Sequence, residues 1–179
     1  MYYLLKENLT GNVTKFETKL HISETEKDYV FFFEAKDSTF YCPYKGYNEN
    51  HYEGDVCEVF IGNADTPREY YEIEITPDGA IFLAKVYNKS TETTKSLELT
   101  YLENDLIKVE TQKFEKDYTV KISISKEKLN IPLEKIAFNA FRIETEGIRQ
   151  DMNDLSLIPT KDETFHKLGF FVMLKDYLK

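Results

Sequence analysis

Several residue types that build specialised folds are rare or missing in this sequence. Among its 179 residues there are no tryptophans, two cysteines, five prolines and seven glycines. Two cysteines cannot form the disulfide framework of a small secreted domain, so the fold must rest on a hydrophobic core. No apolar run approaches the roughly 20 residues that span a bilayer, and no charged region followed by an apolar one marks a leader. We therefore predict a soluble cytoplasmic protein, or a secreted one if a leader precedes this sequence.

Basic residues are also in short supply. The 23 lysines and arginines face 32 aspartates and glutamates, which gives a formal net charge of −9. A field of that sign repels phosphate groups, whether they belong to a nucleic-acid backbone or to an anionic membrane surface. We therefore expect neither nucleic acid nor a membrane as a partner.

The sequence motifs of common catalytic and metal sites are missing as well. There is no Gly-x-Ser-x-Gly elbow, no glycine-rich phosphate loop, no paired cysteine spacing and no His-Glu-x-x-His motif. Only three histidines are present to act as a base for a nucleophile. These patterns predict no catalytic residue and no cofactor. A pair of acidic residues, as in glycosidases, is the catalytic arrangement that the composition leaves open.

Aromatic and β-branched residues, by contrast, are abundant. The sequence is 41% hydrophobic and 15% aromatic, which suffices for a buried core. Apolar residues mostly follow the two-residue period of strands, and one short helical turn is expected at residues 125–129. The pattern predicts an all-β fold, an antiparallel β-sandwich, in one domain over residues 1–179. Residues 29–35 are continuously apolar or aromatic up to Glu34, which predicts a central strand buried on both faces. The other expected strands lie at residues 14–22, 56–61, 70–75, 80–87, 97–101, 107–111, 118–125, 136–143 and 155–158, with a last segment ending at 174.

One stretch, residues 51–62, combines an aromatic loop with a strand that carries a single carboxylate. Side chains alternate between the two faces of a strand. Cys57 therefore lies on a fully apolar face and is expected to be a small core residue. Glu58 shares the opposite face with Val56 and Phe60. A carboxylate between two hydrophobic residues, close to aromatic side chains, is a candidate ligand site.

The loop before this strand contains four tyrosines. Its proline, glycine and asparagine residues predict a long loop, and long loops in compact domains are often functional. Sugar rings present apolar C–H faces that stack on aromatic side chains, so the four, Tyr41, Tyr44, Tyr47 and Tyr52, are candidates for a stacking platform. The alternative is that these tyrosines only anchor the loop to the domain.

Glu72 and Glu74 stand inside the next strand and share the face of Glu58 if the two strands are neighbours. Arg142 is the cation expected beside them, since it too lies within a predicted strand. Two interpretations stay open: a structural salt bridge across the sheet, or a polar floor whose carboxylates and guanidinium bind sugar hydroxyls. A hydrolase that uses Glu58 with Glu72 or Glu74 is a third.

Several segments taken together resemble a known family. They are YEGDVCEVFI at 52–61, YYEIEITPDG at 70–79, FNAFRIE at 138–144, LSLIPT at 155–160, FH at 165–166 and LGF at 168–170. In this order and spacing the sequence resembles the family 9 carbohydrate-binding modules and their stand-alone relatives, from about residue 29 to residue 174. The resemblance implies a β-sandwich of immunoglobulin-like or jelly-roll-like character that holds a sugar between two aromatic rings, with calcium in a structural role.

The resemblance also implies roles for particular residues. Tyr52 matches the first ring of the clamp, Glu58 matches the strand glutamate, and Asn139 and Arg142 match the Asn-x-x-Arg of a late strand. Leu157 stands where relatives often carry a tryptophan and Ile158 replaces a serine, so a second ring would have to come from Tyr44, Tyr47 or His51. His166, in the Phe-His pair, is expected either to bond the backbone or to contact a ligand.

The sequence thus predicts a non-catalytic, carbohydrate-binding-like module. Its expected carbohydrate-binding residues are Tyr52, Glu58, Arg142, Asn139, Tyr44 and Tyr47. A saccharide is the expected partner, and no metal ligand is identified. The alternative is a protein-interaction or structural β-sandwich that has lost sugar binding, with a glycoside hydrolase as a less favoured reading.

Overall fold

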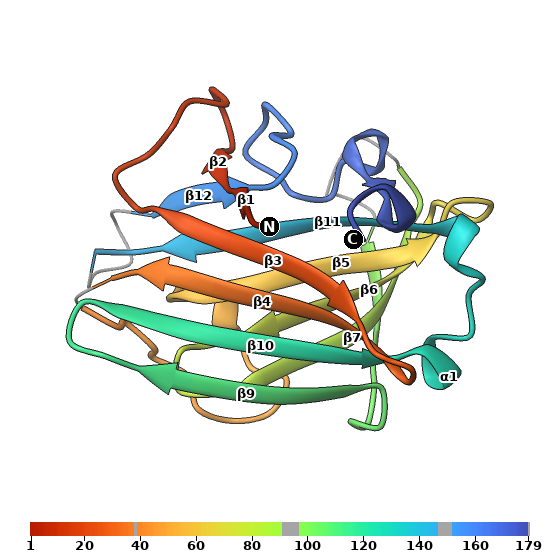
Figure 1. The fold of residues 1–179 in the computed structure, drawn as a ribbon, viewed down its shortest axis with the longest axis horizontal. Helices are drawn as coiled ribbons and strands as arrows, with labels where there is room; N and C mark the ends of the chain where they lie inside the picture. Colours follow the sequence, from red (N-terminus) through yellow and green to blue (C-terminus); the bar gives the residue numbers. More distant parts are fainter. Residues whose placement is uncertain (38, 91–96, 147–151, 179) are drawn as a thin grey trace.

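The chain folds into two antiparallel sheets that pack face to face (Figure 1). The structure is a computed structural model, and it describes residues 1–37, 39–90, 97–146 and 152–178. The smaller sheet has the strand order β1-β3-β4-β10-β9, and the larger runs β2-β12-β11-β5-β6-β7-β8, with β13 pairing to β11. The strands are β1 Tyr3–Leu4, β2 Lys6–Glu7, β3 Thr18–Glu24, β4 Asp28–Lys36, β5 Val56–Asn63, β6 Glu69–Ile75, β7 Ile81–Asn88, β8 Leu97–Tyr101, β9 Ile107–Lys113, β10 Asp117–Ser125, β11 Ile136–Glu144, β12 Asn153–Ser156 and β13 Val172–Met173. The predicted all-β sandwich is confirmed.

Among the described residues, helical structure is confined to short turns. The α-helix α1 (Lys126–Leu129) begins after Ser125, whose hydroxyl accepts a hydrogen bond from the backbone N–H of Lys128, as predicted for a helix cap. Four 3₁₀ turns complete the described helical segments: η1 His51–Glu53, η2 Leu133–Lys135, η4 Leu168–Phe170 and η5 Leu174–Asp176. No helix among the described residues is long and apolar enough to cross a membrane.

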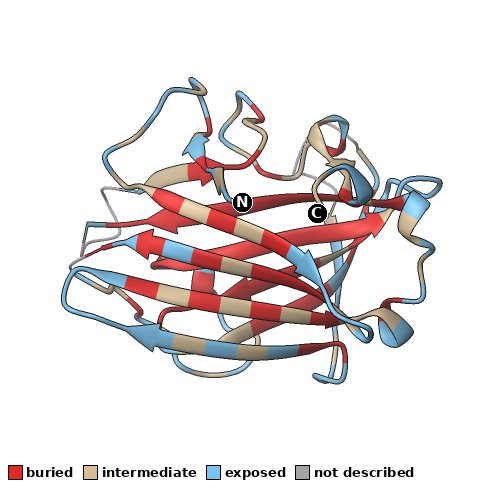
Figure 2. Cartoon of the chain, viewed as in Figure 1, coloured by how far each residue is buried: buried red, intermediate tan, exposed pale blue. Residues whose placement is uncertain are grey.

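The main core lies between the two sheets. Phe31 of β4 packs there at 5.4 Å, ring centroid to ring centroid, from Phe138 of β11. Cys57 is completely buried in this layer, with its Sγ 3.6 Å from the hydroxyl of Tyr118, so its predicted place in the core is confirmed. Inward and outward residues alternate along the strands of the smaller sheet, as Figure 2 shows for β3 and β10.

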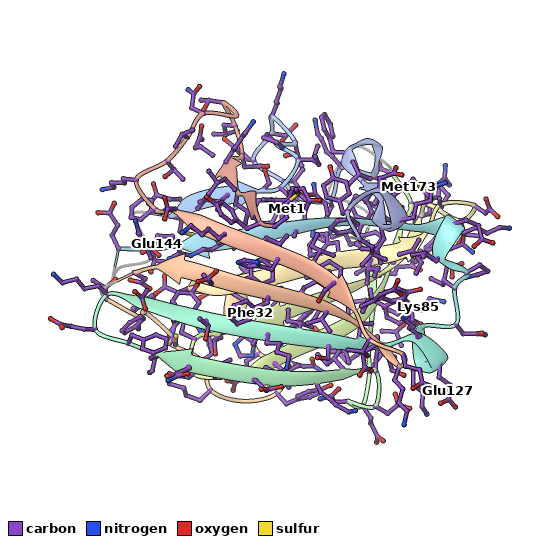
Figure 3. All side chains as sticks on the ribbon, viewed as in Figure 1. Met1, Phe32, Lys85, Glu127, Glu144 and Met173 are labelled. Carbon is purple, nitrogen blue, oxygen red and sulfur yellow. The ribbon has the colours of Figure 1, made fainter. Side chains whose placement is uncertain are left out.

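Strands β4 and β5 differ in how their outer faces are covered. In β4, Phe32 is only partly buried and Glu34 is exposed, so the prediction of a strand buried on both faces is wrong for its outer side (Figure 3 labels Phe32). An apolar run alone does not indicate whether anything covers it. In β5, every residue from Val56 to Gly62 is buried. The outer face of the larger sheet is therefore covered in part by other segments of the chain. The candidate site lies beside the covered part.

Candidate functional site

A second apolar cluster lies on the outer face of the larger sheet. Phe60 of β5 and Phe141 of β11 belong to it, with ring centroids 5.0 Å apart. Phe165, from the segment after β12, stacks on Phe141 at 4.2 Å with the ring planes inclined by 13°. This segment covers one part of the outer face with aromatic contacts and leaves the neighbouring part open.

The open part is a cleft of about 850 Å³. Its floor comes from β5, β6 and β7, and its walls come from η1, β8, β12 and residues 162–166. That volume lies within the range of small-molecule sites in proteins. The lining residues include Tyr52, Phe60, Phe82, Leu97, Leu99, Tyr101, Ile143, Met152, Phe165 and His166, together with six acidic residues.

Three glutamates form the floor. Glu58 of β5 pairs in register with Glu74 of β6, and Phe60 pairs with Glu72, so the three carboxyl groups share the outer face. The conditional prediction that Glu72 and Glu74 lie on the face of Glu58 is confirmed. Asp154 of β12 adds a fourth carboxyl group beside them. We call Glu58, Glu72, Glu74 and Asp154 the cleft cluster.

The carboxyl groups of the cleft cluster resist ionisation. Burial, followed by the negative charges of Glu72 and Asp154, raises the pKa of Glu58 well above its ordinary value. Burial, with Glu58 and Glu72 nearby, does the same to the pKa of Glu74. Burial raises the pKa of Glu72 to about 7 and that of Asp154 to about 6. Glu58 Oε1, Glu74 Oε2 and Asp154 Oδ1 are buried and make no hydrogen bond to the described residues.

Two tyrosines form the rim of the cleft. Tyr52 on η1 is 45% exposed, and Tyr101 on β8 is 58% exposed. Tyr101 lies edge to face on Phe82, at a centroid distance of 5.8 Å. Tyr52 was expected at the site and Tyr101 was not. The signal available was the alternation of Leu97, Leu99 and Tyr101 along an otherwise polar strand, which puts all three on one face.

The other loop tyrosines lie elsewhere. The hydroxyl of Tyr44 donates to Glu53 Oε2 at 2.9 Å, and that of Tyr47 donates to the carbonyl of Leu102 at 2.8 Å. Neither residue lines the cleft. His51 is 1% exposed and presents no free ring face. These contacts anchor the loop, which is the alternative that the sequence left open for Tyr44 and Tyr47.

Arg142 lies on the face of β11 opposite to the glutamates. Phe141 pairs in register with Glu58, and Arg142 pairs with Cys57, whose side chain lies in the core. The guanidinium is completely buried between the sheets. It donates to Thr18 Oγ1 at 3.0 Å, to the Lys36 carbonyl at 2.9 Å and to the carboxylate of Glu144. The expected grouping of Arg142 with the three glutamates is therefore wrong, because a shift of one residue in a strand reverses the face.

Asn139 is also buried away from the cleft. Its amide nitrogen donates to the carbonyl of Ile158 at 2.9 Å, and its side-chain oxygen accepts from the backbone N–H of Ile158 at 3.1 Å. The side chain thus pins the segment that follows β12 to β11. Asn139 does not line the cleft.

His166 does line the cleft. Its Nδ1 lies 2.6 Å from the hydroxyl of Tyr70, and its ring centroid lies 5.0 Å from that of Phe60. Burial lowers the pKa of its imidazole to about 4, so the ring is neutral near pH 7 even though Nε2 is 3.8 Å from Glu72 Oε1. The backbone carbonyl of His166 accepts from Asn88 at 3.2 Å. The partner of the His166 ring is thus a side-chain hydroxyl rather than the expected backbone group, and contact with a ligand stays a prediction that its place in the cleft allows.

A separate acidic group lies between the sheets. Asp37, Asp55 and Glu144 bring one carboxylate oxygen each to within 4.8 Å of one another, and all three are buried (Figure 3 labels Glu144). Arg142 donates to Glu144 and lies 4.0 Å from Asp37 Oδ2. We call Asp37, Asp55, Arg142 and Glu144 the inner cluster.

The inner cluster fits the structural calcium that the family resemblance implies. Carboxylate oxygens are the ligands that calcium prefers, and three acidic groups face one guanidinium, which leaves negative charge in excess. Asp37 Oδ2 is buried and makes no hydrogen bond to the described residues. Asp37, Asp55 and Glu144 would hold the ion, which would supply the charge that ties the end of β4 to β5 and β11.

Comparison with solved structures identifies proteins that share this fold. No family model matches the sequence, and no curated protein sequence matches it either. A structure from Bacteroides uniformis, provisionally described as a carbohydrate-binding protein, superposes with a TM-score of 0.75 at 16% identity, covering 96% of this chain and 84% of that one.

Two further structures are of a family 9 carbohydrate-binding module from Caldicellulosiruptor kristjanssonii. Its complex with glucose matches with a TM-score of 0.61 at 11% identity, covering 95% of this chain and 82% of that one. Its complex with cellotriose matches with the same score and identity, covering 96% and 79%. The chain therefore has the fold of the family 9 carbohydrate-binding modules, as the sequence resemblance implied.

Proposed function

We propose that this chain is a non-catalytic module that binds a saccharide in the cleft on the outer face of its larger sheet. The observation that carries the proposal is the composition of that cleft. Exposed Tyr52 and Tyr101 supply ring faces at the rim. At the floor, one buried oxygen each of Glu58 and Glu74 lacks a hydrogen-bond partner among the described residues. A sugar offers both complements, since its C–H faces stack on rings and its hydroxyls donate to carboxylates.

Structural similarity supports the same assignment. The modules that share this fold include one solved with glucose and with cellotriose. Fold alone does not establish function, so the proposal rests on the cleft.

Hydrolysis is a weaker reading of the same carboxyl groups. Glycosidases need one carboxyl that stays protonated and one that is ionised, so their environments push the two pKa values apart. In the cleft cluster the pKa values of Glu58, Glu72 and Glu74 are all raised, chiefly by burial. The three also lie together on one floor, on neighbouring strands, rather than on opposite sides of a substrate.

Titration with glucose and cellotriose, followed by amide NMR shifts and calorimetry, tests the proposal. We expect shifts centred on Tyr52, Tyr101 and Glu58, with affinity between about millimolar and tens of micromolar, because few contacts must offset the cost of immobilising the sugar. Absence of any shift in the cleft across neutral, acidic and amino sugars would refute saccharide binding. Release of reducing ends from oligosaccharides on prolonged incubation would refute the non-catalytic assignment.

A further inference from the structure

The cleft has a strong excess of acidic side chains over basic ones. No lysine or arginine is among its lining residues, whereas six acidic residues are: Glu58, Glu72, Glu74, Asp154, Asp162 and Glu163. Asp162 is paired with Lys167 at 2.5 Å, which offsets one of them from outside the cleft. His166 is neutral near pH 7 because burial lowers its pKa to about 4. The cleft cluster is therefore left without a cation from the described part of the chain.

The floor of the cleft carries carboxyl oxygens that have no hydrogen-bond partner among the described residues. Glu58 and Glu74 are each 2% exposed, and one oxygen of each is buried without a hydrogen bond to the described residues. Asp154 Oδ1 is in the same condition. Burying such groups without partners costs free energy, so a ligand that supplies donors at these oxygens gains strongly.

The arrangement of the carboxyl groups indicates what kind of cation would fit. Among the residues that the structure describes, the inner cluster alone brings ligand atoms of three acidic groups within 4.8 Å of one another. The carboxyl groups of the cleft cluster are spread over three strands and do not converge on one point, so a bare metal ion does not match them. An ammonium group carried on a sugar ring does match, because it offers three donors while the hydroxyls of the ring reach the other carboxyl groups.

The aromatic residues of the cleft favour the same ligand. Phe60 lies on the floor, and Phe82 and Tyr101 form an edge-to-face pair beside it. The faces of such rings attract cations. An anionic sugar, such as one carrying a carboxylate, would meet like charges on the floor and no compensating base among the lining residues.

We propose that the cleft selects a cationic amino sugar with a free ammonium group over neutral and acidic sugars. This rests on the proposed function, since it names the class of saccharide for the same cleft. The ammonium contacts Glu58 and Glu74, and the ring stacks at the rim formed by Tyr52 and Tyr101.

The test compares three trisaccharides with the same β-1,4 linkage: the glucosamine trimer, the N-acetylglucosamine trimer and cellotriose. At pH 7 and low salt we expect the glucosamine trimer to bind about tenfold or more tightly than the other two in calorimetry. The advantage should shrink at pH 9.5, because the amine of the sugar is then uncharged. It should also shrink at pH 5, because protons then compete more strongly with the ammonium for the carboxyl groups of Glu58, Glu72, Glu74 and Asp154, whose pKa values burial raises.

A substitution of Glu58 tests the contribution of its charge without a large change in the shape of the cleft. Glu58→Gln keeps the size of the side chain but cannot carry a charge, so we expect it to weaken binding of the glucosamine trimer by a larger factor than binding of cellotriose. Glu110→Gln is the matched control, because that side chain is 72% exposed on the other sheet.

The outcomes separate the two proposals. Equal or weaker binding of the glucosamine trimer, with cellotriose still bound in the cleft, refutes the preference and leaves saccharide binding intact. Failure of all three trisaccharides to bind refutes both. If Glu58→Gln does not fold, the comparison of the three ligands on the unaltered chain still decides the question.

Discussion

The inner cluster and the cleft cluster are both groups of buried acidic residues at the larger sheet, but their charges are met in different ways. In the inner cluster the chain supplies its own cation, Arg142, and Asp55 accepts from the backbone and hydroxyl of Thr145 at 2.9 and 2.7 Å. In the cleft cluster, Glu58 and Glu74 retain oxygens without partners among the described residues. A buried polar group whose partners belong to the fold stabilises it, whereas one left open at a cleft is available to a ligand.

Removing the internal cation should have the largest effect on stability. Arg142→Met leaves the buried carboxylates of the inner cluster without their guanidinium, and we expect the free energy of unfolding to fall by about 3–5 kcal/mol. Urea unfolding measures this directly. Arg68→Met, at an exposed position, is the control and should change stability by less than about 0.5 kcal/mol. Equal losses in the two variants would show that the inner cluster does not depend on Arg142.

Calcium should stabilise the inner cluster and leave the cleft cluster unaffected. At a concentration about 100 times its dissociation constant, a bound ion adds about 2.7 kcal/mol, which corresponds to a rise in Tm of about 5–10 °C for a chain of this size. Calorimetry with and without a chelator measures the shift. Asp37→Asn should remove it and Glu58→Gln should not, and a shift that survives Asp37→Asn would place the ion elsewhere.

The cleft cluster should make the unliganded fold less stable as the pH rises. A carboxyl whose pKa is higher in the folded than in the unfolded chain stabilises the fold below its unfolded pKa, and that contribution is lost as the pH rises through its folded pKa. For Glu72 the window runs from about 4.5 to about 7. We expect the free energy of unfolding to fall by about 2 kcal/mol less across this window in Glu72→Gln than in the unaltered chain. The upper limit for that difference is about 1.36 kcal/mol for each unit by which folding raises the pKa.

Urea unfolding at pH 5 and pH 8 measures that change, with Glu110→Gln as the exposed control. A pH dependence identical in Glu72→Gln and the unaltered chain would mean that Glu72 is not the group whose ionisation is suppressed.

Truncating the rim should weaken binding without affecting the fold. We expect Tyr52→Ala and Tyr101→Ala each to reduce affinity for cellotriose about five- to tenfold, since a stacked ring contributes roughly 1 kcal/mol. Tyr47→Ala is the matched control, because Tyr47 is 44% exposed but lies outside the cleft. A loss of affinity in Tyr47→Ala as large as in Tyr52→Ala would move the binding site onto the loop.

Part of the candidate site follows from strand periodicity. The alternation around Glu58, with Val56 and Phe60 on its face and Cys57 on the other, predicts which side chains share a face, and the structure agrees. Tyr101 and His166 required more than periodicity, because they reach the cleft from a distant strand and from the segment after β12. The covering of one part of the outer face by Phe165 is likewise a contact between segments far apart in sequence.

The sequence by itself determined the all-β class of this protein, the local strand pairing faces and the acidic, tryptophan-free character of its candidate site. These depend on composition and on a two-residue period, which are local properties. Only the tertiary structure decided that Arg142 faces the core and Glu58 faces the cleft, because the pairing of Phe141 with Glu58 is a matter of register between two strands about 80 residues apart. That register separates a cluster that contains its own cation, Arg142, from one whose carboxyl groups are left open to a ligand.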